Sequence, residues 1–126
     1  MFKMLVTMLP RTNLSSSELP HFIKKPSPLE VGLVGSDLEL ECQAGGDPAP
    51  VIHWRRSHHK TDLTGHNVKY LETGGVVLMN LHPSDEGEYE CRAENKIGSV
   101  VSKVMIIVEE KPVITVAPEN SVQVNT

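Results

Sequence analysis

The chain has 126 residues, 39% of them hydrophobic, so it is long enough for one domain with a core and too apolar for wholesale disorder. Its net charge is −4 and its Lys and Arg residues are scattered, whereas a nucleic-acid surface needs a dense basic stripe. No apolar run approaches the ~20 residues of a membrane span, and no phosphate-binding loop or His-Glu-x-x-His pattern occurs. We therefore expect no nucleic-acid partner, no membrane span in this fragment, no catalytic residues and no cofactor.

Residues 1–19 have the composition of a disordered leader or linker. The start, MFKMLVTMLP, combines one Lys with a short apolar patch, but it ends in Pro10 and has no clear small-residue cleavage site, so it makes a poor signal peptide. The SSSE run that follows is typical of a solvated linker. Asn13-Leu14-Ser15 fits the acceptor sequon for N-glycosylation, which makes Asn13 a candidate glycan site if the protein is secreted, although chance matches are frequent.

Residues 20–110 show the two-residue period of half-buried β-strands. LELEC alternates apolar and acidic residues, and VIHWRR puts Ile52 and Trp54 on one side of a strand. Further strands are expected in GVVLMNL, EYECRAEN and SVVSKVMIIVEE, with clusters of turn-forming residues between them. No helical period exceeds two turns. The pattern predicts an all-β sandwich, in which Pro26 and Pro28 break the first strand and keep it at a sheet edge.

The two cysteines, Cys42 and Cys91, stand 49 positions apart. If paired, they would close a long loop and stabilise the fold by roughly 4 kcal/mol on the chain-entropy model. Such a bond suits an oxidising compartment. Two buried free thiols, which are common in cytosolic proteins, are the alternative, and the spacing alone does not decide between the two.

The segment HPSDEGEYEC carries the most specific local pattern of the chain. Tyr89 and Cys91 are two residues apart, so they share one face of a strand and both point inward. Asp85 and Gly87 precede that strand, where the chain turns a corner. A Tyr in this position can return its hydroxyl to the backbone of the corner. Together with Trp54 between the two cysteines, these residues form a combination that is a specific sequence signal, although any one of them alone would be a weak signal.

With these residues the chain resembles the immunoglobulin superfamily, and more closely its intermediate type, the I-set, over about residues 20–110. The matching residues are Gly35, Leu38, Leu40, Cys42, Gly46, Pro48, Pro50, Trp54, Leu78, Leu81, Asp85, Gly87, Tyr89, Cys91, Ala93, Asn95 and Gly98. The short HHKTDLTGHN segment lacks room for two extra strands, which favours the I-set over the variable type.

The resemblance implies a two-sheet antiparallel β-sandwich with Greek-key connections and a Cys42–Cys91 disulfide packed on Trp54. The corner Asp of the family often pairs with a basic residue, for which Lys69 is the nearest candidate here. The structural core implied by the resemblance consists of Trp54, Tyr89, Leu40, Leu78, Asp85 and Gly87.

The outer face of the predicted sandwich is the best candidate for recognition of a partner. Opposite charges across strands contribute only ~0.2–1 kcal/mol each, so a solvated, self-paired face is the alternative. If the face is used, replacing both of its Arg residues by Glu should weaken binding and leave folding intact. Alternation also exposes Val77 and Met79 on the other sheet. The residues expected on the candidate face are His53, Arg55, Glu90, Arg92 and Glu94.

Six histidines raise the question of a metal site. His58, His59 and His66 fall in one loop region, but zinc requires ligands in a tetrahedral array at defined spacing, and no such pattern exists. A solvated loop is therefore expected. A Ser-Asp pair adjoins His82, but side chains of consecutive corner residues diverge, so no catalytic triad is expected.

The resemblance implies a non-catalytic protein-recognition module of a multidomain cell-surface or extracellular-matrix protein, acting in cell adhesion or axon guidance. Its partners would be other proteins, including copies of itself if binding is homophilic. The alternatives are an intracellular, muscle-type or actin-associated scaffold, and the non-catalytic ectodomain part of a receptor kinase, receptor phosphatase or matrix peroxidase. The presence of both cysteines favours the outside of the cell, with any attachment to the plasma membrane through parts not in this chain.

Residues 111–126 are expected to form a hinge and the first strand of a truncated second immunoglobulin-like domain. The stretch PVITVAPENSVQVNT resumes an extended pattern and stops. The hinge Glu109-Glu110-Lys111-Pro112 contains a Pro that would stiffen it, so that neighbouring domains would hold a defined angle.

Overall fold

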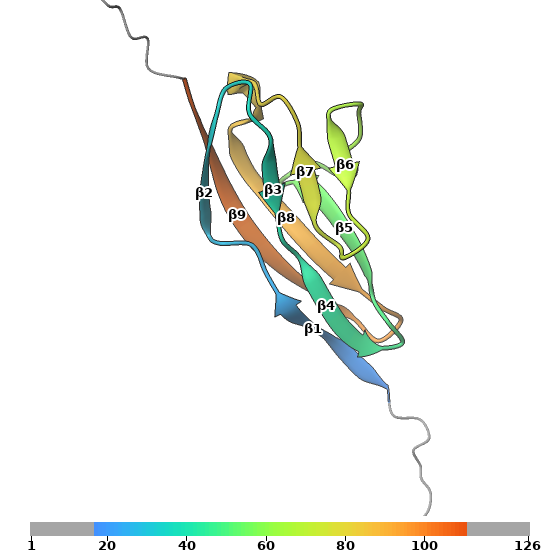
Figure 1. Ribbon diagram of the computed structural model, residues 1–126. Coiled ribbons are helices and arrows are strands. Elements are labelled where there is room, and N and C mark those ends of the chain that lie inside the picture. The colour runs from blue at the N-terminus through green and yellow to red at the C-terminus, as the bar shows by residue number, and fades with distance from the viewer. Residues whose placement is uncertain (1–16, 111–126) are drawn as a thin grey trace, which may run out of the picture.

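The computed structural model describes residues 17–110, which fold into two layers of β-strands (Figure 1). The candidate glycan site Asn13 and the expected second-domain strand in residues 111–126 lie outside the described residues. In chain order the elements are β1 (Glu18–Lys24), β2 (Leu29–Leu33), β3 (Leu38–Leu40), β4 (Gln43–Asp47), β5 (Val51–Arg56), β6 (Val68–Tyr70), β7 (Val76–Leu78), the 3-10 helix η3 (Pro83–Asp85), β8 (Gly87–Glu94) and β9 (Ser99–Glu109).

One layer is a four-stranded sheet in the order β2-β9-β8-β5, and the other combines β3-β7-β6 with the pair β1-β4 (Figure 1). β3 and β4 belong to one run of chain that is interrupted only at residues 41 and 42. All strand pairs are antiparallel except β2 with β9, which is parallel. The structure confirms the predicted two-sheet β-sandwich and adds one parallel pair that alternation could not reveal.

The first strand of the domain is split between the two layers. Up to Lys24 it pairs with β4, and from Leu29 onward it pairs with β9. The crossing between them contains Pro26 and Pro28, which cannot donate ladder hydrogen bonds. As a result, both halves lie at sheet edges. β1 begins at Glu18, two residues before the expected start, because the Asn95 side chain donates a hydrogen bond of 2.8 Å to the Glu18 carbonyl.

The core lies between the two layers. It consists of side chains that the alternation of residues along each strand directs inward. Along β8, every second residue from Tyr89 to Ala93 is buried on the inner face, as the alternation of EYECRAEN predicts. Both layers contribute side chains that are at most 4% exposed, namely Leu40, Val76, Leu78, Leu81, Tyr89, Cys91, Ala93, Val104 and Ile106.

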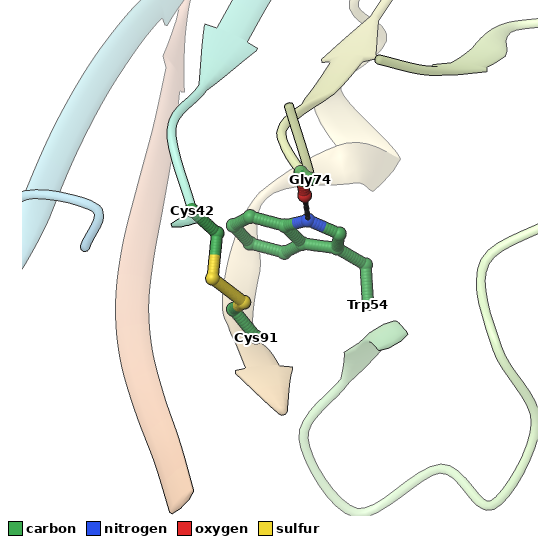
Figure 2. The surroundings of a disulfide bond; sticks show 4 residues. All are labelled: Cys42, Trp54, Gly74 and Cys91. Atoms are coloured by element: carbon green, nitrogen blue, oxygen red, sulfur yellow. Dashed lines mark hydrogen bonds between the residues drawn. A yellow bond between two sulfur atoms is a disulfide. The ribbon is translucent and has the colours of Figure 1, made fainter. Parts of the chain in front are cut away.

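The Cys42–Cys91 disulfide joins the two layers beside Trp54 (Figure 2). Trp54 is fully buried, stands opposite Cys91 in the β5–β8 ladder, and donates its indole N–H to the Gly74 carbonyl at 2.8 Å. Gly74 has a φ of 109°, and a Cβ there would collide with the Cys42 carbonyl. The bridge, the indole and the Gly74 turn therefore form one packed unit.

We predict that Trp54→Ala lowers the free energy of unfolding by about 3–5 kcal/mol, because it leaves a cavity beside the disulfide. Trp54→Phe should cost less, because it keeps one aromatic ring in the core and loses only the remaining indole volume and the donor to Gly74. Chemical denaturation monitored by circular dichroism measures both. An unchanged midpoint for Trp54→Ala would contradict this description of the core.

Candidate recognition face and its supporting corner

The corner before β8 holds that strand in place through backbone contacts. The Asp85 carboxylate accepts the His82 N–H at 2.8 Å, and the Tyr89 hydroxyl donates to the Asp85 carbonyl at 2.6 Å. Asp85 and Gly87 are partly buried at this corner rather than in the central core. Gly87 adopts a φ of 147°, which favours glycine.

Arg56, and not Lys69, is the basic residue that contacts this corner, and it does so through backbone carbonyls rather than through the Asp85 carboxylate. Its guanidinium donates to the Ser84 carbonyl at 2.9 Å and to the Glu86 carbonyl at 2.6 Å, and it lies 5.0 Å from the centroid of the Tyr89 ring. No ion pair joins Asp85 to Lys69 within residues 17–110, so that expectation was wrong. The sequence could have indicated Arg56. It follows Trp54 by two residues on the same strand, so its side chain points to the same inner side of the sheet, at the end of the sandwich.

Burial raises the pKa of the Tyr89 hydroxyl above its ordinary value of 10.0. The nearby Asp85 charge raises this pKa further, and the Arg56 charge acts in the opposite direction. Tyr89 therefore stays neutral and able to donate to the corner backbone over the whole physiological range.

The five residues expected on the candidate face all lie on β5 and β8, on the outer side of the four-stranded sheet. Arg55 stands opposite Glu90, and their Nε and Oε2 atoms are 2.6 Å apart. Glu90 was expected to be solvated, but only 6% of it is exposed, because the Arg55 side chain closes over its carboxylate. This pair is part of the structure rather than a free binding group.

The remaining residues of this face, His53, Arg92 and Glu94, stay accessible. His53 Nδ1 lies 3.0 Å from Asp62 Oδ2, and Arg92 Nε lies 3.6 Å from Glu94 Oε1. The side chains of His53, Arg92 and Glu94 are 37%, 36% and 49% exposed. Together with Arg55 and Asp62 they line a shallow hollow of about 240 Å³. Asp62, in the loop after β5, is a member of this group that the sequence analysis missed, since no local pattern connects it to β5.

Toward its other border the same outer face exposes apolar side chains on β2 and β9, and β9 also carries Lys103, which is 56% exposed and lies 3.8 Å from the Glu88 carboxylate. Leu29, Val31 and Met105 are 56%, 52% and 41% exposed, and Leu33 is 39% exposed. Alternation along the sequence indicated Val77 and Met79 instead, and both are partly buried. Alternation in the LEVGL run could have identified the exposed apolar side chains, but only once the run was known to lie beside β9.

The described residues carry no arrangement suited to other kinds of site. Within residues 17–110 no three His, Cys, Asp or Glu side chains gather as metal ligands would. This part of the chain also contains no helix with the length and apolar character needed to cross a membrane.

Comparison with known proteins places the chain in a family. The model of the Immunoglobulin I-set domain matches residues 20–108, so the chain belongs to the I-set immunoglobulin family, whose domains are generally non-catalytic. It is 38% identical over 109 residues to the mouse (Mus musculus) Peroxidasin homolog, covering 86% of this chain and 7% of that protein. It is 31% identical over 105 residues to human (Homo sapiens) Roundabout homolog 1, covering 83% of this chain and 6% of that protein.

Solved structures agree with the family assignment. A chain of the Titin–Obscurin-like 1 Ig complex superposes with a TM-score of 0.68 at 28% identity, over 76% of this chain and 99% of that one. The chain thus matches a whole domain of that complex but less than a tenth of either curated relative.

We predict that Tyr89→Phe lowers the unfolding free energy by about 1 kcal/mol at neutral pH, because the Asp85 carbonyl loses its hydroxyl donor. Since the folded-state pKa of Tyr89 is raised, its contribution is complete below about pH 10 and is lost as the pH rises through the folded value. Urea denaturation between neutral pH and about pH 11 should therefore show a shallower alkaline decline for the variant. Equal declines in the variant and the parent would contradict this role of Tyr89.

A second prediction separates the two Arg residues of the candidate face. Arg55→Glu should lower the unfolding free energy on the order of 2–4 kcal/mol, because buried Glu90 would lose its partner and face another carboxylate. Arg92→Glu, at an exposed position, should change it by less than about 0.5 kcal/mol. The expectation that both Arg residues are replaceable without effect on folding is thereby corrected for Arg55. Equal melting curves for the two variants would count against the Arg55–Glu90 pair.

Proposed function

We propose that this chain is a protein-recognition module of a multidomain cell-surface or extracellular-matrix protein, acting in cell adhesion or axon guidance. The observation that carries this proposal is the disulfide between Cys42 and Cys91, which are 1% and 0% exposed. Disulfides of this kind persist in oxidising compartments. The family assignment supports recognition without catalysis, and the small share of each curated relative that the chain covers supports a multidomain parent.

The outer face of the β2-β9-β8-β5 sheet is the surface we assign to a protein partner. Its part on β5 and β8, with His53, Arg92 and Glu94, is accessible and borders a hollow too shallow to enclose a small ligand. These charges already pair with neighbours, so they would contribute more to the choice and orientation of a partner than to raw affinity. The exposed apolar side chains on β2 and β9 would supply the desolvated contact area.

An intracellular scaffold is a second candidate, because the fold also matches a whole domain of the Titin–Obscurin-like 1 Ig complex. In a reducing compartment the two cysteines would be free thiols. Alkylation of the protein as isolated from its native source, under denaturing conditions without reductant, would distinguish the two. Modification of both Cys42 and Cys91 would favour the scaffold, and protection of both would favour the extracellular module.

The recognition role is testable with the chain coated on beads and a panel of purified extracellular immunoglobulin-domain proteins that includes the chain itself. We expect the native chain to bind at least one panel member. The double variant Arg92→Glu with Glu94→Lys should bind at least about tenfold more weakly, because it reverses accessible charges on the face. Lys69→Glu, at an exposed position in the other layer, is the matched control and should bind as the native chain does. No binding by the native chain, or equal binding by the double variant, would contradict the proposal.

A further inference from the structure

The strand β2 leaves one of its two edges unpaired within the described residues. In the four-stranded sheet it is the terminal strand and pairs only with β9 (Figure 1). The Pro28 carbonyl accepts the Met105 N–H, and the Val34 N–H donates to the Glu109 carbonyl, both at 2.8 Å. Even-numbered residues therefore direct their backbone groups toward β9. Because successive residues of a strand point to opposite sides, the N–H and C=O groups of residues 29 and 31 and the Leu33 N–H face the open edge. The Leu33 carbonyl already accepts the Ser36 N–H at 3.0 Å.

The side chains of these same three residues are apolar and exposed. Leu29, Val31 and Leu33 are 56%, 52% and 39% exposed, and they continue onto Met105 of the neighbouring strand. Natural edge strands are kept from further pairing by a Lys, a Pro, a bulge or an inward-pointing charge. The five residues of β2 include no Lys, Pro or bulge, and Glu30, which lies on the inner side beside Ile106, is the one feature of this kind. An edge of this kind is a template for another strand.

We propose that β2 pairs antiparallel with β2 of a second copy of this chain, about a two-fold axis at Val31. This inference rests on the proposed recognition function and names its partner and contact. In this register Val31 meets its own symmetry mate, and Leu29 of one copy meets Leu33 of the other. This register hydrogen-bonds the open N–H and C=O groups of residues 29 and 31 and the Leu33 N–H. The Leu33 carbonyl, which already accepts the Ser36 N–H, accepts a second hydrogen bond in this register.

Charge is also compatible with this register. Glu30, the charged residue of β2, stands opposite Gly32 of the other copy, so no two carboxylates face each other across the junction. A register centred on Glu30 would bring the two Glu30 side chains together, which is unfavourable. Six apolar side chains would gather on the outer face of a continuous sheet, three from each copy, flanked by Met105 of both.

The contact area is small, because it consists of one five-residue strand and its neighbour from each copy. Specific stable interfaces bury about 1,200–2,000 Å² in total, so the single contact belongs to the weak class. On a surface that displays many copies, however, weak contacts combine through effective concentration. The expected behaviour of the isolated chain is thus association that depends strongly on concentration.

Analytical ultracentrifugation of the full chain at increasing concentration tests the proposal. The average mass should rise from 13.9 kDa toward twice that value. Val31→Lys should weaken association at least tenfold, because it places two like charges at the axis, and a melting curve would show that the variant is folded. Val51→Lys is the matched control, since Val51 is 60% exposed on β5, at the opposite border of the same sheet. It should associate as the native chain does.

A cysteine variant reports on the register itself. Directly opposed residues of a hydrogen-bonded antiparallel pair have Cα atoms about 5.5 Å apart, within the range of a disulfide. Val31→Cys should therefore form a covalent dimer under mild oxidation, and Val51→Cys should not. The native bridge leaves no other free thiol among the described residues.

Two outcomes would overturn the proposal and would differ from a failure of the recognition function. If the chain is a monomer at all concentrations and the Cys of the Val31→Cys variant is reactive, the edge of β2 stays open. If the chain is a monomer and the Cys of the Val31→Cys variant is protected, another segment, such as residues 111–126, covers the edge of β2. In either case binding of other panel proteins to the Arg92 face would leave the recognition function standing.

Discussion

The structure depends on the contact between the Cys42–Cys91 disulfide and the Trp54 indole. The disulfide is the covalent link between the two layers, and the indole fills the space beside it and reaches the Gly74 carbonyl (Figure 2). A side chain at Gly74 would collide with the Cys42 carbonyl, so the turn, the bridge and the ring fit only together. This unit fixes which side of β5 and β8 faces inward, and the apolar residues that alternate along these strands are buried on that side.

The same unit determines what the surface presents. β5 and β8 carry Trp54 and Cys91 inward, so the alternate residues of both strands must point outward. The corner formed by Arg56, Tyr89 and Asp85 then holds the start of β8 in position. The outer face therefore presents charged side chains on β5, β8 and β9 beside exposed apolar side chains on β2 and β9.

Much of this architecture could be predicted from the sequence. Strand alternation and the Cys…Trp…Cys constellation led to the correct fold class, the disulfide and the side of the sheet on which each charged residue lies. Alternation in the sequence indicates on which side of the sheet a residue lies, but not how deeply its side chain is buried. For this reason Glu90 was expected in solvent, although Arg55 covers it. The expectation for Lys69 failed for a related reason, because Arg56, an inward residue at the end of β5, binds the carbonyls of Ser84 and Glu86 in a loop that is distant in sequence.

The exposed apolar residues of the face show the limit of reasoning along a single strand. Leu29, Val31 and Leu33 become a patch only because β2 pairs in parallel with the distant β9. No local signal states which edge a short strand will join. The chain belongs to the I-set family, whereas the composition of its outer face arises from pairings between strands that are remote in sequence.

The central claim is that the disulfide clamps the two layers, and comparison of the oxidised and reduced domains tests it most directly. Unfolding free energies measured by denaturant titration, with the disulfide intact and after complete reduction, should differ by about 4 kcal/mol in favour of the oxidised form. Equal unfolding free energies for the two forms would contradict the account.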